Sequence, residues 1–319
     1  MPSLLDFLKN SRVLRIGFGF DGQILNMQEI PKITFTKKSK IEIEFEIFTI
    51  SSLFSRQGKL DLALDKPHRV DFYHVIYITR GTGAHYIDFN PYAYTEGSII
   101  FISKGQVHAF DVRSDTDGFV ILFTDDFLSK NLIHSDILSF YRLYNYHLHE
   151  PVIQPEETGG DVFKMIVNEM YWEYLLLNNF AKEEILRLLL KLLLLRAERI
   201  KRTLISKEKN TQWFTTFSVF KKYLEKHFAE TRNASDYARM MKMSYKHLNG
   251  VCKSITGNTA KAFIDQFIIL ETKRRLAVSD IPVKELSYAL GFDEPTNFVK
   301  FFKKHTRQSP SQFRKKLTH

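Results

Sequence analysis

The chain has 319 residues, and its 44% hydrophobic and 14% aromatic content excludes an intrinsically disordered protein. Its net charge of +10 is uneven: residues from Lys207 onward hold 22 Lys and Arg against 10 Asp and Glu, and the remainder holds 24 against 26. An excess of +12 confined to one segment indicates a polyanionic partner for that segment, because each neutralised phosphate releases counterions.

The first residues, M-P-S-L-L-D-F-L-K-N-S-R, lack the basic start and unbroken apolar run of a signal peptide. The longest apolar stretch, residues 185–195, is interrupted by Arg187 and Lys191 and is too short to span a bilayer. We therefore expect a cytoplasmic protein. A single cysteine, Cys252, excludes an internal disulfide and a cysteine-based zinc site, and we interpret it as a buried core residue.

Short runs with strand patterning follow one another from residue 13 to about residue 123. In chain order they are residues 13–20, 41–48, 74–79, 84–89, 98–102 and 119–123. The turn sequences N-P at Asn90 and R-G-T-G-A at Arg80 separate runs. Many short strands at even spacing predict a sandwich or barrel, which we assign to a domain over residues 1–156.

The pattern becomes helical from Asp161. Apolar spacing predicts one helix there and a second, leucine-rich helix from about Lys182 to Leu204. The leucines of this second helix cover more than one face, so the helix must be covered on two sides. Both sides could be covered within the molecule, but we favour a homodimer interface over residues 161–204, in a helical segment spanning residues 157–206. The polar run K-E-K-N-T, residues 207–211, is the best candidate linker.

The last third contains one pattern twice, at an offset of 50 positions. In the first copy, a supporting helix over Ala234–Met241 precedes Ser244, whose hydroxyl we expect to cap the second helix. The inward face carries Leu248, Val251, Cys252 and Ile255, and the outward face carries Tyr245, Lys246, Asn249, Gly250 and Lys253. Lys and Asn can hydrogen-bond guanine O6/N7 and adenine N6/N7, so this copy reads as a helix-turn-helix DNA reader.

In the second copy, a supporting helix over Val283–Leu290 is followed by Gly291 at the turn, and Asp293 or Glu294 caps the next helix. The inward residues are Phe298, Phe301 and Phe302, with His305 expected in the core; the outward residues are Thr296, Asn297, Lys300 and Lys303. This copy predicts a second DNA reader.

One continuous helix, Ala260 to Val278, is predicted between the copies. Nineteen residues span about 28 Å at ~1.5 Å per residue, close to the roughly 34 Å of one DNA turn. Two recognition helices on such a strut could enter successive major grooves. A merely solubilising charge would not explain why the basic residues follow the repeated helices.

Four segments carry a specific resemblance: S-I-T-G (254–257), L-S-Y-A-L-G-F-D (286–293), F-V-K-F-F-K-K (298–304) and S-P-S-Q-F-R (309–314). They resemble the DNA-binding domain of AraC/XylS-type transcription regulators, here residues 207–319. The resemblance implies base contacts by Lys246, Asn249 and Gly250, then Thr296, Asn297 and Lys300. Gly250 lacks a side chain where many relatives carry one. Arg307 stands where relatives have the glycine matched by Gly257, which implies either a strained helix end or a phosphate contact.

The segments 67–83 and 102–110 more loosely resemble the cupin-type sensor half of these regulators, which implies a barrel that binds a small effector or none. Candidate effector-binding residues are His68, Tyr73, His74, Tyr86 and His108, each of which could equally be an ordinary surface or core residue. A metal-binding cupin needs a His-x-His pair, and Val70 breaks that pair after His68. A metal site of His68, His74 and His108 stays open, but we expect no metal and no cofactor.

The sequence thus predicts an α+β multidomain protein with a cupin-like β-barrel, a helical dimerisation segment and an all-α domain with two helix-turn-helix motifs. The leading hypothesis is a sequence-specific transcription regulator, an activator, with promoter DNA and RNA polymerase as partners and no catalytic residues. The alternative is a metal-dependent cupin enzyme fused to a DNA-binding domain. A third hypothesis is an architectural DNA binder whose barrel is dispensable.

Overall fold

The computed structural model describes residues 32–33, 44–55, 64–111, 115–129, 143–144, 150–158, 161–176, 180–204 and 211–317. These residues belong to two compact units, and the division between them falls after Lys207. The first unit contains strands and helices, and the second is helical. The strand expected at residues 13–20 lies outside the described residues.

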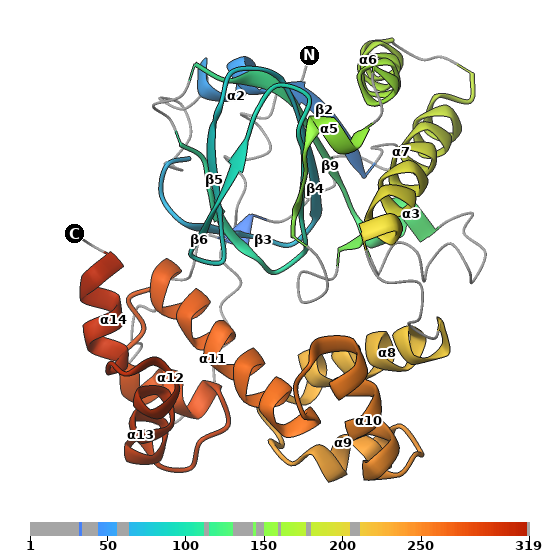
Figure 1. Ribbon diagram of the computed structural model, residues 1–319. Coiled ribbons are helices and arrows are strands. Elements are labelled where there is room, and N and C mark those ends of the chain that lie inside the picture. The colour runs from blue at the N-terminus through green and yellow to red at the C-terminus, as the bar shows by residue number, and fades with distance from the viewer. Residues whose placement is uncertain are drawn as a thin grey trace. The chain divides into compact units, whose positions relative to one another are not determined.

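The described strands of the first unit form two sheets of five strands each (Figure 1). Their bounds are β1 (Lys32–Ile33), β2 (Phe45–Thr49), β3 (His68–Val70), β4 (Tyr73–Arg80), β5 (Gly83–Ile87), β6 (Asn90–Tyr94), β7 (Ile99–Ile102), β8 (Val107–Ala109), β9 (Asp117–Phe123) and β10 (Val152–Ile153). Sheet A has the order β1-β3-β8-β5-β6, and sheet B has the order β10-β7-β4-β9-β2. The expected barrel is therefore not closed in the described part of the chain.

The hairpin between β5 and β6 corrects one predicted turn. We expected the turn at Asn90 and Pro91, but both residues lie in β6, and Pro91 pairs with Tyr86. The chain reverses two residues earlier, at Asp88 and Phe89, which have φ of 48° and 72°. Proline is tolerated in β6 because this strand is at the edge of sheet A, where a missing N–H need not break the ladder.

Both faces of sheet B are covered by apolar side chains. Along β4, Val75 and Tyr77 pack against the helices of the unit, whereas Ile76 and Ile78 pack in the core that includes residues of sheet A. The helices of this unit are α2 (Ile50–Ser55), α3 (Asp125–Ser129), α5 (Pro155–Thr158), α6 (Val162–Leu175) and α7 (Lys182–Leu204). Figure 1 shows α6 and α7 beside sheet B, so the predicted helical segment is built into the first unit.

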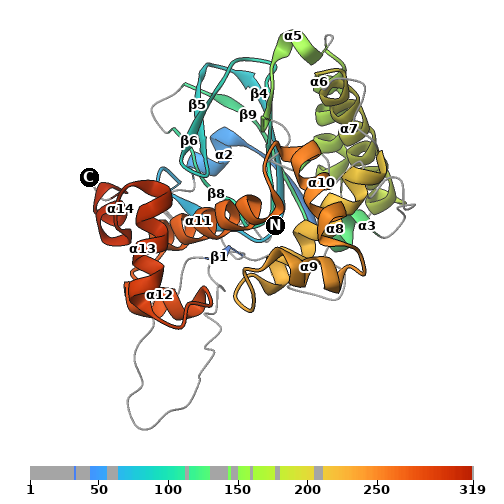
Figure 2. The same ribbon diagram turned by 60° about the horizontal axis from the view of Figure 1, so that its bottom comes forward.

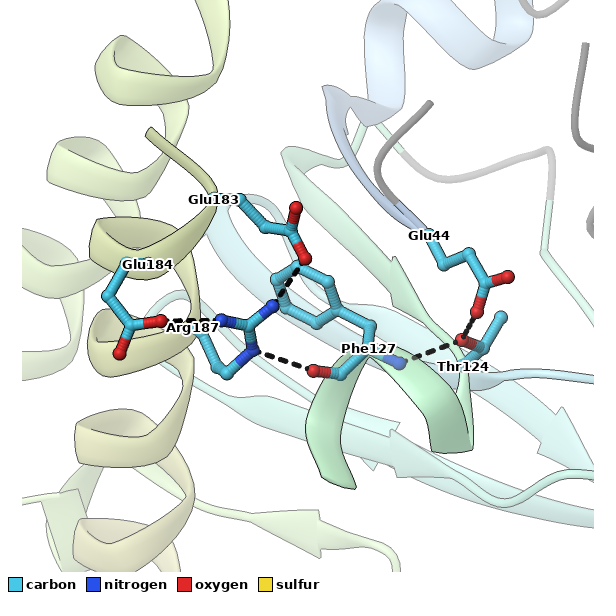
Figure 3. Close-up of polar contacts among 6 residues, drawn as sticks. All are labelled: Glu44, Thr124, Phe127, Glu183, Glu184 and Arg187. Carbon is cyan, nitrogen blue, oxygen red and sulfur yellow. Dashed lines mark hydrogen bonds and ion pairs between the residues drawn. The ribbon is translucent and has the colours of Figure 1, made fainter. Parts of the chain in front are cut away.

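A buried arginine links α7 to α3, the helix that follows β9. Arg187 donates from Nε to the carbonyl oxygen of Phe127 in α3 at 2.9 Å, and its guanidinium lies over the Phe127 ring, 5.0 Å from the centroid. The same guanidinium donates to Glu184 at 2.6 Å and also to Glu183, as Figure 3 shows. Its charge is thereby paired although the side chain is buried.

The second unit contains seven helices among residues 211–317. They are α8 (Thr211–His227), α9 (Ala234–Met240), α10 (Tyr245–Thr256), α11 (Ala260–Val278), α12 (Val283–Ala289), α13 (Pro295–Thr306) and α14 (Pro310–Leu317). The predicted connecting helix is confirmed with the expected bounds. Figures 1 and 2 both show α11 running between α8–α10 and α12–α14. None of the helices that the structure describes is long and apolar enough to cross a membrane.

Candidate functional site

The first helix-turn-helix comprises α9 and α10, and its local structure follows the sequence prediction. Ser244 is the N-cap of α10, and its side-chain oxygen accepts a hydrogen bond from the His247 backbone N–H at 3.1 Å. All four residues predicted to face inward are buried: Leu248, Val251, Cys252 and Ile255. These contacts fix which face of α10 points outward.

The outward face of α10 carries the predicted DNA contacts. Ser244, Tyr245, Lys246 and Lys253 are exposed, and Asn249 and Gly250 are half-buried. A Cβ added at Gly250 would meet nothing within 4 Å, so this part of the helix surface is open. The exposed face is therefore basic at both ends and bare at Gly250.

Asn249 has a structural contact that the sequence did not indicate. Its side-chain oxygen accepts a hydrogen bond from the backbone N–H of Ala260 at 3.0 Å. That N–H is one of the first in α11, which have no partner within their own helix. Adenine recognition by asparagine uses both the amide oxygen and the amide nitrogen, so this bond orients the Asn249 amide and occupies one of the two lone pairs of its oxygen.

The second helix-turn-helix comprises α12 and α13. Its N-cap is Glu294, whose side chain makes no capping hydrogen bond, and Pro295 is in the first turn. Phe298 and Phe302 are buried as predicted, and Phe301 is half-buried. The prediction for His305 is wrong: it is exposed, and its ring lies against Phe301 with centroids 4.7 Å apart.

The outward face of α13 is fully exposed and more basic. Its exposed residues are Thr296, Asn297, Lys300, Lys303 and, at the C-cap, Arg307. Arg307 has φ of 60° and ψ of 11°, a left-handed conformation that is strained for a residue with a Cβ. Gly257, at the same point of the first copy, has φ of 73°. The strain expected from the sequence is present, and the Arg307 side chain is free to extend into solvent.

The cationic residues of the two recognition helices are not neutralised within the unit. Lys246, Lys253, Lys300, Lys303 and Arg307 form no ion pair with a carboxylate in the described part of the chain. Exposed lysine and arginine without internal partners are available to DNA phosphates.

The turn of the second helix-turn-helix is held by a close backbone contact. Gly291 has φ of 76°, and a Cβ placed on it would lie 1.9 Å from the carbonyl oxygen of Ala229, which follows α8. Beside it, the Arg232 guanidinium lies 3.8 Å from the centroid of the Phe292 ring. These contacts place the second reader against the segment between α8 and α9.

A second candidate site lies inside the first unit, where His68, His74, His85 and His108 form what we call the histidine cluster. His68, His85 and His108 come from β3, β5 and β8 of sheet A, and His74 comes from β4 of sheet B. Ring centroids lie 4.2 Å apart for His68 and His108, and 4.9 Å apart for His74 and His108. All four side chains are buried.

Hydrogen bonding in the histidine cluster is incomplete. His68 Nδ1 donates to the Lys66 carbonyl oxygen at 3.1 Å. One hydrogen bond of 3.1 Å joins His85 Nε2 to His108 Nδ1, with one nitrogen donating and the other accepting. His74 Nδ1 and His108 Nε2 are buried and have no hydrogen-bond partner among the described residues. Since buried polar atoms are normally paired, these two nitrogens mark a place where a ligand or a water molecule can bind.

Burial controls the charge of these rings. Desolvation lowers the pKa of His85 to about 3, with a further contribution from His68. Desolvation also lowers the pKa of His74 and His108 well below the usual value, and their histidine neighbours add to the effect. For His68, desolvation lowers the pKa, against a smaller opposite effect of its bond to the Lys66 carbonyl. At neutral pH the histidine cluster is uncharged.

The structure brings together three of the five predicted effector-binding residues. Tyr73 faces the helices on the other side of β4, where its hydroxyl donates to Asp125 Oδ1 at 3.1 Å. Tyr86 is 40% exposed because it alternates with the buried His85 and Ile87 along β5. Neither tyrosine joins the histidine cluster.

His85 joins the cluster, although the sequence reasoning did not select it. The available signal was its position in β5, two residues from Ile87 on the same face of the strand. Within the described residues, no group of three or more histidine, cysteine or acidic side chains is arranged to hold a metal ion. The four rings therefore do not fit the metal site of His68, His74 and His108 that the sequence left open.

Two family models match the chain, one over the unit that contains the histidine cluster and one over the unit that contains the two helix-turn-helix motifs. Residues 55–153 match the AraC-like ligand binding domain, and residues 237–316 match a helix-turn-helix domain. The HTH-type transcriptional activator RhaS of Escherichia coli O139:H28 (strain E24377A / ETEC) is 24% identical over 260 residues, which cover 77% of this chain and 86% of RhaS. RhaS of Escherichia coli (strain SE11) matches to the same extent.

Two solved structures also align with the chain. Wild-type ToxT from Vibrio cholerae strain SCE256, with a bound unsaturated fatty acid, has a TM-score of 0.43 and 13% identity over 86% of this chain and 96% of that chain. The C-terminal domain of the response regulator yesN from Fusobacterium nucleatum subsp. nucleatum has a TM-score of 0.30 and 19% identity over 31% of this chain and 98% of that chain.

The matched domains occur in the predicted order, and they define a DNA-binding transcription regulator with an N-terminal ligand-binding domain. The chain belongs to the AraC/XylS-type family of these regulators.

Proposed function

We propose that this regulator activates transcription from promoters in the cytoplasm, where it binds DNA through α10 and α13 and acts on RNA polymerase. The activating sign rests on its likeness to RhaS, which is described as a transcriptional activator. The DNA contacts are Ser244, Tyr245, Lys246, Asn249, Gly250 and Lys253 in the first reader and Thr296, Asn297, Lys300, Lys303 and Arg307 in the second.

One observation carries the proposal for DNA binding. Two recognition helices of 12 residues each are joined through a single 19-residue helix, and both expose lysines that form no ion pair among the described residues. Such a rigid connection fixes the spacing of the two readers, which is what successive major grooves require.

Binding of the full chain to a promoter fragment, measured at several salt concentrations, tests this proposal. We expect specific binding, with the logarithm of the affinity falling by roughly 0.9 per decade of salt for each phosphate neutralised. A scrambled fragment of the same length is the control. Equal affinity for both fragments would reject sequence-specific regulation and favour an architectural DNA binder.

We also propose that residues 161–204 form a homodimer interface. Leu188, Leu192 and Leu195 in α7 are 56%, 42% and 41% exposed, although the same helix buries leucines against sheet B. Their spacing places them in one stripe along the helix. An exposed apolar stripe on a helix already packed on its opposite side is typical of an association surface.

The Leu188→Asp, Leu192→Asp double variant should shift sedimentation from dimer to monomer at micromolar concentration, because each charge must lose water to remain in the interface. Leu317→Asp in α14, a leucine that is 37% exposed, is the matched control and should remain dimeric. A monomeric wild type, or a double variant that still dimerises, would contradict this interface.

We further propose that the first unit binds a small effector at the histidine cluster, and that the protein has no catalytic activity. The match to an AraC-like ligand binding domain and the two buried nitrogens without partners support the location. Elemental analysis of the purified protein separates this proposal from the cupin-enzyme alternative. Stoichiometric iron, manganese, nickel or zinc would favour the enzyme.

A further inference from the structure

Among the described residues, no carboxylate is positioned to neutralise a charge on His74, His85 or His108. The electrostatic effects on His74, His85 and His108 come from other histidines of the cluster, and no described carboxylate is among them. Asp88, at the turn after β5, is occupied on the sheet A side, where it accepts from Gln106 Nε2 at 2.8 Å and from the Val107 backbone N–H at 3.2 Å. A proton bound by one ring would therefore repel a proton on the next.

Among the described residues, the side chains that flank His74, His85 and His108, apart from the cluster itself, include apolar groups from both sheets. His74 lies between Ile102 of β7 and Leu122 of β9 in sheet B, and the Phe72 ring stacks on it at 5.0 Å. On the sheet A side, the Phe110 ring lies 4.8 Å from the ring of His85 and 5.9 Å from the ring of His108. Neither set of neighbours can solvate an imidazolium, so the charged form is costly in the closed structure.

The hydrogen bond that joins His85 to His108 depends on their protonation. One nitrogen must donate and the other must accept, so at least one of the two rings has to be neutral. When both rings are protonated, two N–H groups face each other and the bond is lost. Protonation of both rings thus breaks a side-chain hydrogen bond between β5 and β8, which are neighbours in sheet A.

From this geometry we propose that the histidine cluster is a pH-sensitive site that stays closed while its rings are neutral, and that acidification opens the ligand-binding unit because the rings take up protons on opening. The effector of the sensor is then the proton itself, an assignment that rests on the sensory role proposed above. Rings that are exposed to water on opening each bind a proton of their own, whereas the closed cluster rejects them.

The direction of the effect follows from linkage. Each of the four rings has its pKa lowered in the folded state, with burial as the largest cause, relative to the ordinary value of 6.5. The contribution to stability is therefore complete above pH 6.5 and is lost as the pH falls below it toward the folded pKa, which for His85 is about 3. Each ring that takes up a proton on opening changes the equilibrium by up to about tenfold per pH unit, so four rings acting together change it by up to ~10⁴-fold.

Hydrogen–deuterium exchange of the full chain, followed by mass spectrometry at pH 7.5 and pH 5.5, tests the proposal. Labelling times are scaled for the intrinsic exchange rate, and each measurement is made with and without a chelator. We expect protection of peptides from β3, β4, β5 and β8 to fall steeply at the lower pH, while peptides from α11 keep theirs. Unchanged protection of the four strands at pH 5.5 would overturn the proposal.

The His85→Gln, His108→Gln double variant removes two of the proton-binding rings. Between pH 7.5 and pH 5.5 its loss of protection should be smaller than that of the wild type by up to about 100-fold. His74→Leu, which places an aliphatic side chain beside Ile102 and Leu122, serves as a second variant if the first does not fold at pH 7.5. The exposed His305→Gln in α13 is the control and should respond to pH as the wild type does.

Two results would reject the histidine cluster as the pH-sensitive site. One is an equal pH response in the wild type and in both cluster variants. The other is a stoichiometric metal in the untreated protein together with a pH response that the chelator abolishes. Specific promoter binding at pH 7.5 is measured separately, so the regulator function can fail or stand whatever the pH response is.

Discussion

The two DNA readers have the same plan but differ in how they are stabilised. Their recognition helices, α10 and α13, begin 50 positions apart and have 12 residues each. The first reader has a side-chain N-cap at Ser244 and a glycine at its left-handed C-cap. Its Asn249 side-chain oxygen accepts a hydrogen bond from the first residue of α11. Its helix ends are well satisfied, but its central surface at Gly250 is bare.

The second reader has the opposite balance. Its N-cap makes no side-chain hydrogen bond and its C-cap is a strained arginine, yet Lys300 stands at the position that matches Gly250. The buried side chains of its own Phe298 and Phe302 hold α13 in place. The first reader therefore has the better-capped recognition helix, and the second has the side chain that extends farther toward DNA. We expect the second reader to contribute more to base recognition.

The largest expected effect is on how the second reader is positioned. Gly291→Ala would place a Cβ 1.9 Å from the Ala229 carbonyl oxygen, in a backbone conformation that also disfavours alanine. We expect a loss of at least ~2 kcal/mol in the free energy of unfolding. Urea denaturation measures it, and Gly250→Ala, where a Cβ meets nothing within 4 Å, is the matched control in the first reader. Equal behaviour of the two glycine variants would contradict the structure at this turn.

The next effect separates the chemistry of the two readers. Lys300→Ala should weaken promoter binding by about 1–3 kcal/mol, the usual contribution of a base-specific contact, and relax the base preference beneath α13. Lys246→Ala should weaken binding less, because the neighbouring residues of α10 offer few further base contacts. Asn249 is hydrogen-bonded to Ala260, and Gly250 has no side chain. Titration of both variants against single-base variants of the promoter measures the difference. A larger loss for Lys246→Ala would reverse the ranking of the readers.

The smallest effect concerns the helix C-caps. Arg307→Gly should stabilise the second unit by roughly 1 kcal/mol, because glycine adopts the left-handed conformation without a Cβ penalty. If Arg307 also contacts a phosphate, the same variant should bind DNA more weakly and show a salt slope lower by about 1. Gly257→Ala in the first reader is the converse change and should destabilise by a similar amount, as read by urea denaturation. An Arg307→Gly variant that is no more stable than the wild type would show that the strain is relieved elsewhere.

The sequence determined the elements whose signals are local. Helical spacing of apolar residues predicted α7, α10, α11 and α13, and the hydroxyl of Ser244 identified a helix start, because these patterns depend on residues within one or two turns. Strict alternation likewise located β2, and short apolar runs located β4 and β9. It could not place the turn after β5, since Asn90-Pro91 carries a turn signal that an edge strand can accommodate.

Only the tertiary structure decided which side chains meet. His85 joins His68, His74 and His108 because pairing between β5 and β8, and the facing of sheets A and B, bring four distant strands together. Tyr73 is separated from His74, its neighbour in sequence, because successive strand residues point to opposite faces. Asn249 is bound to Ala260, 11 positions away, because the chain folds back so that the first residue of α11 lies beside α10. Local patterns fix the helices and strands, whereas contacts between distant segments decide which of their polar groups remain free to bind.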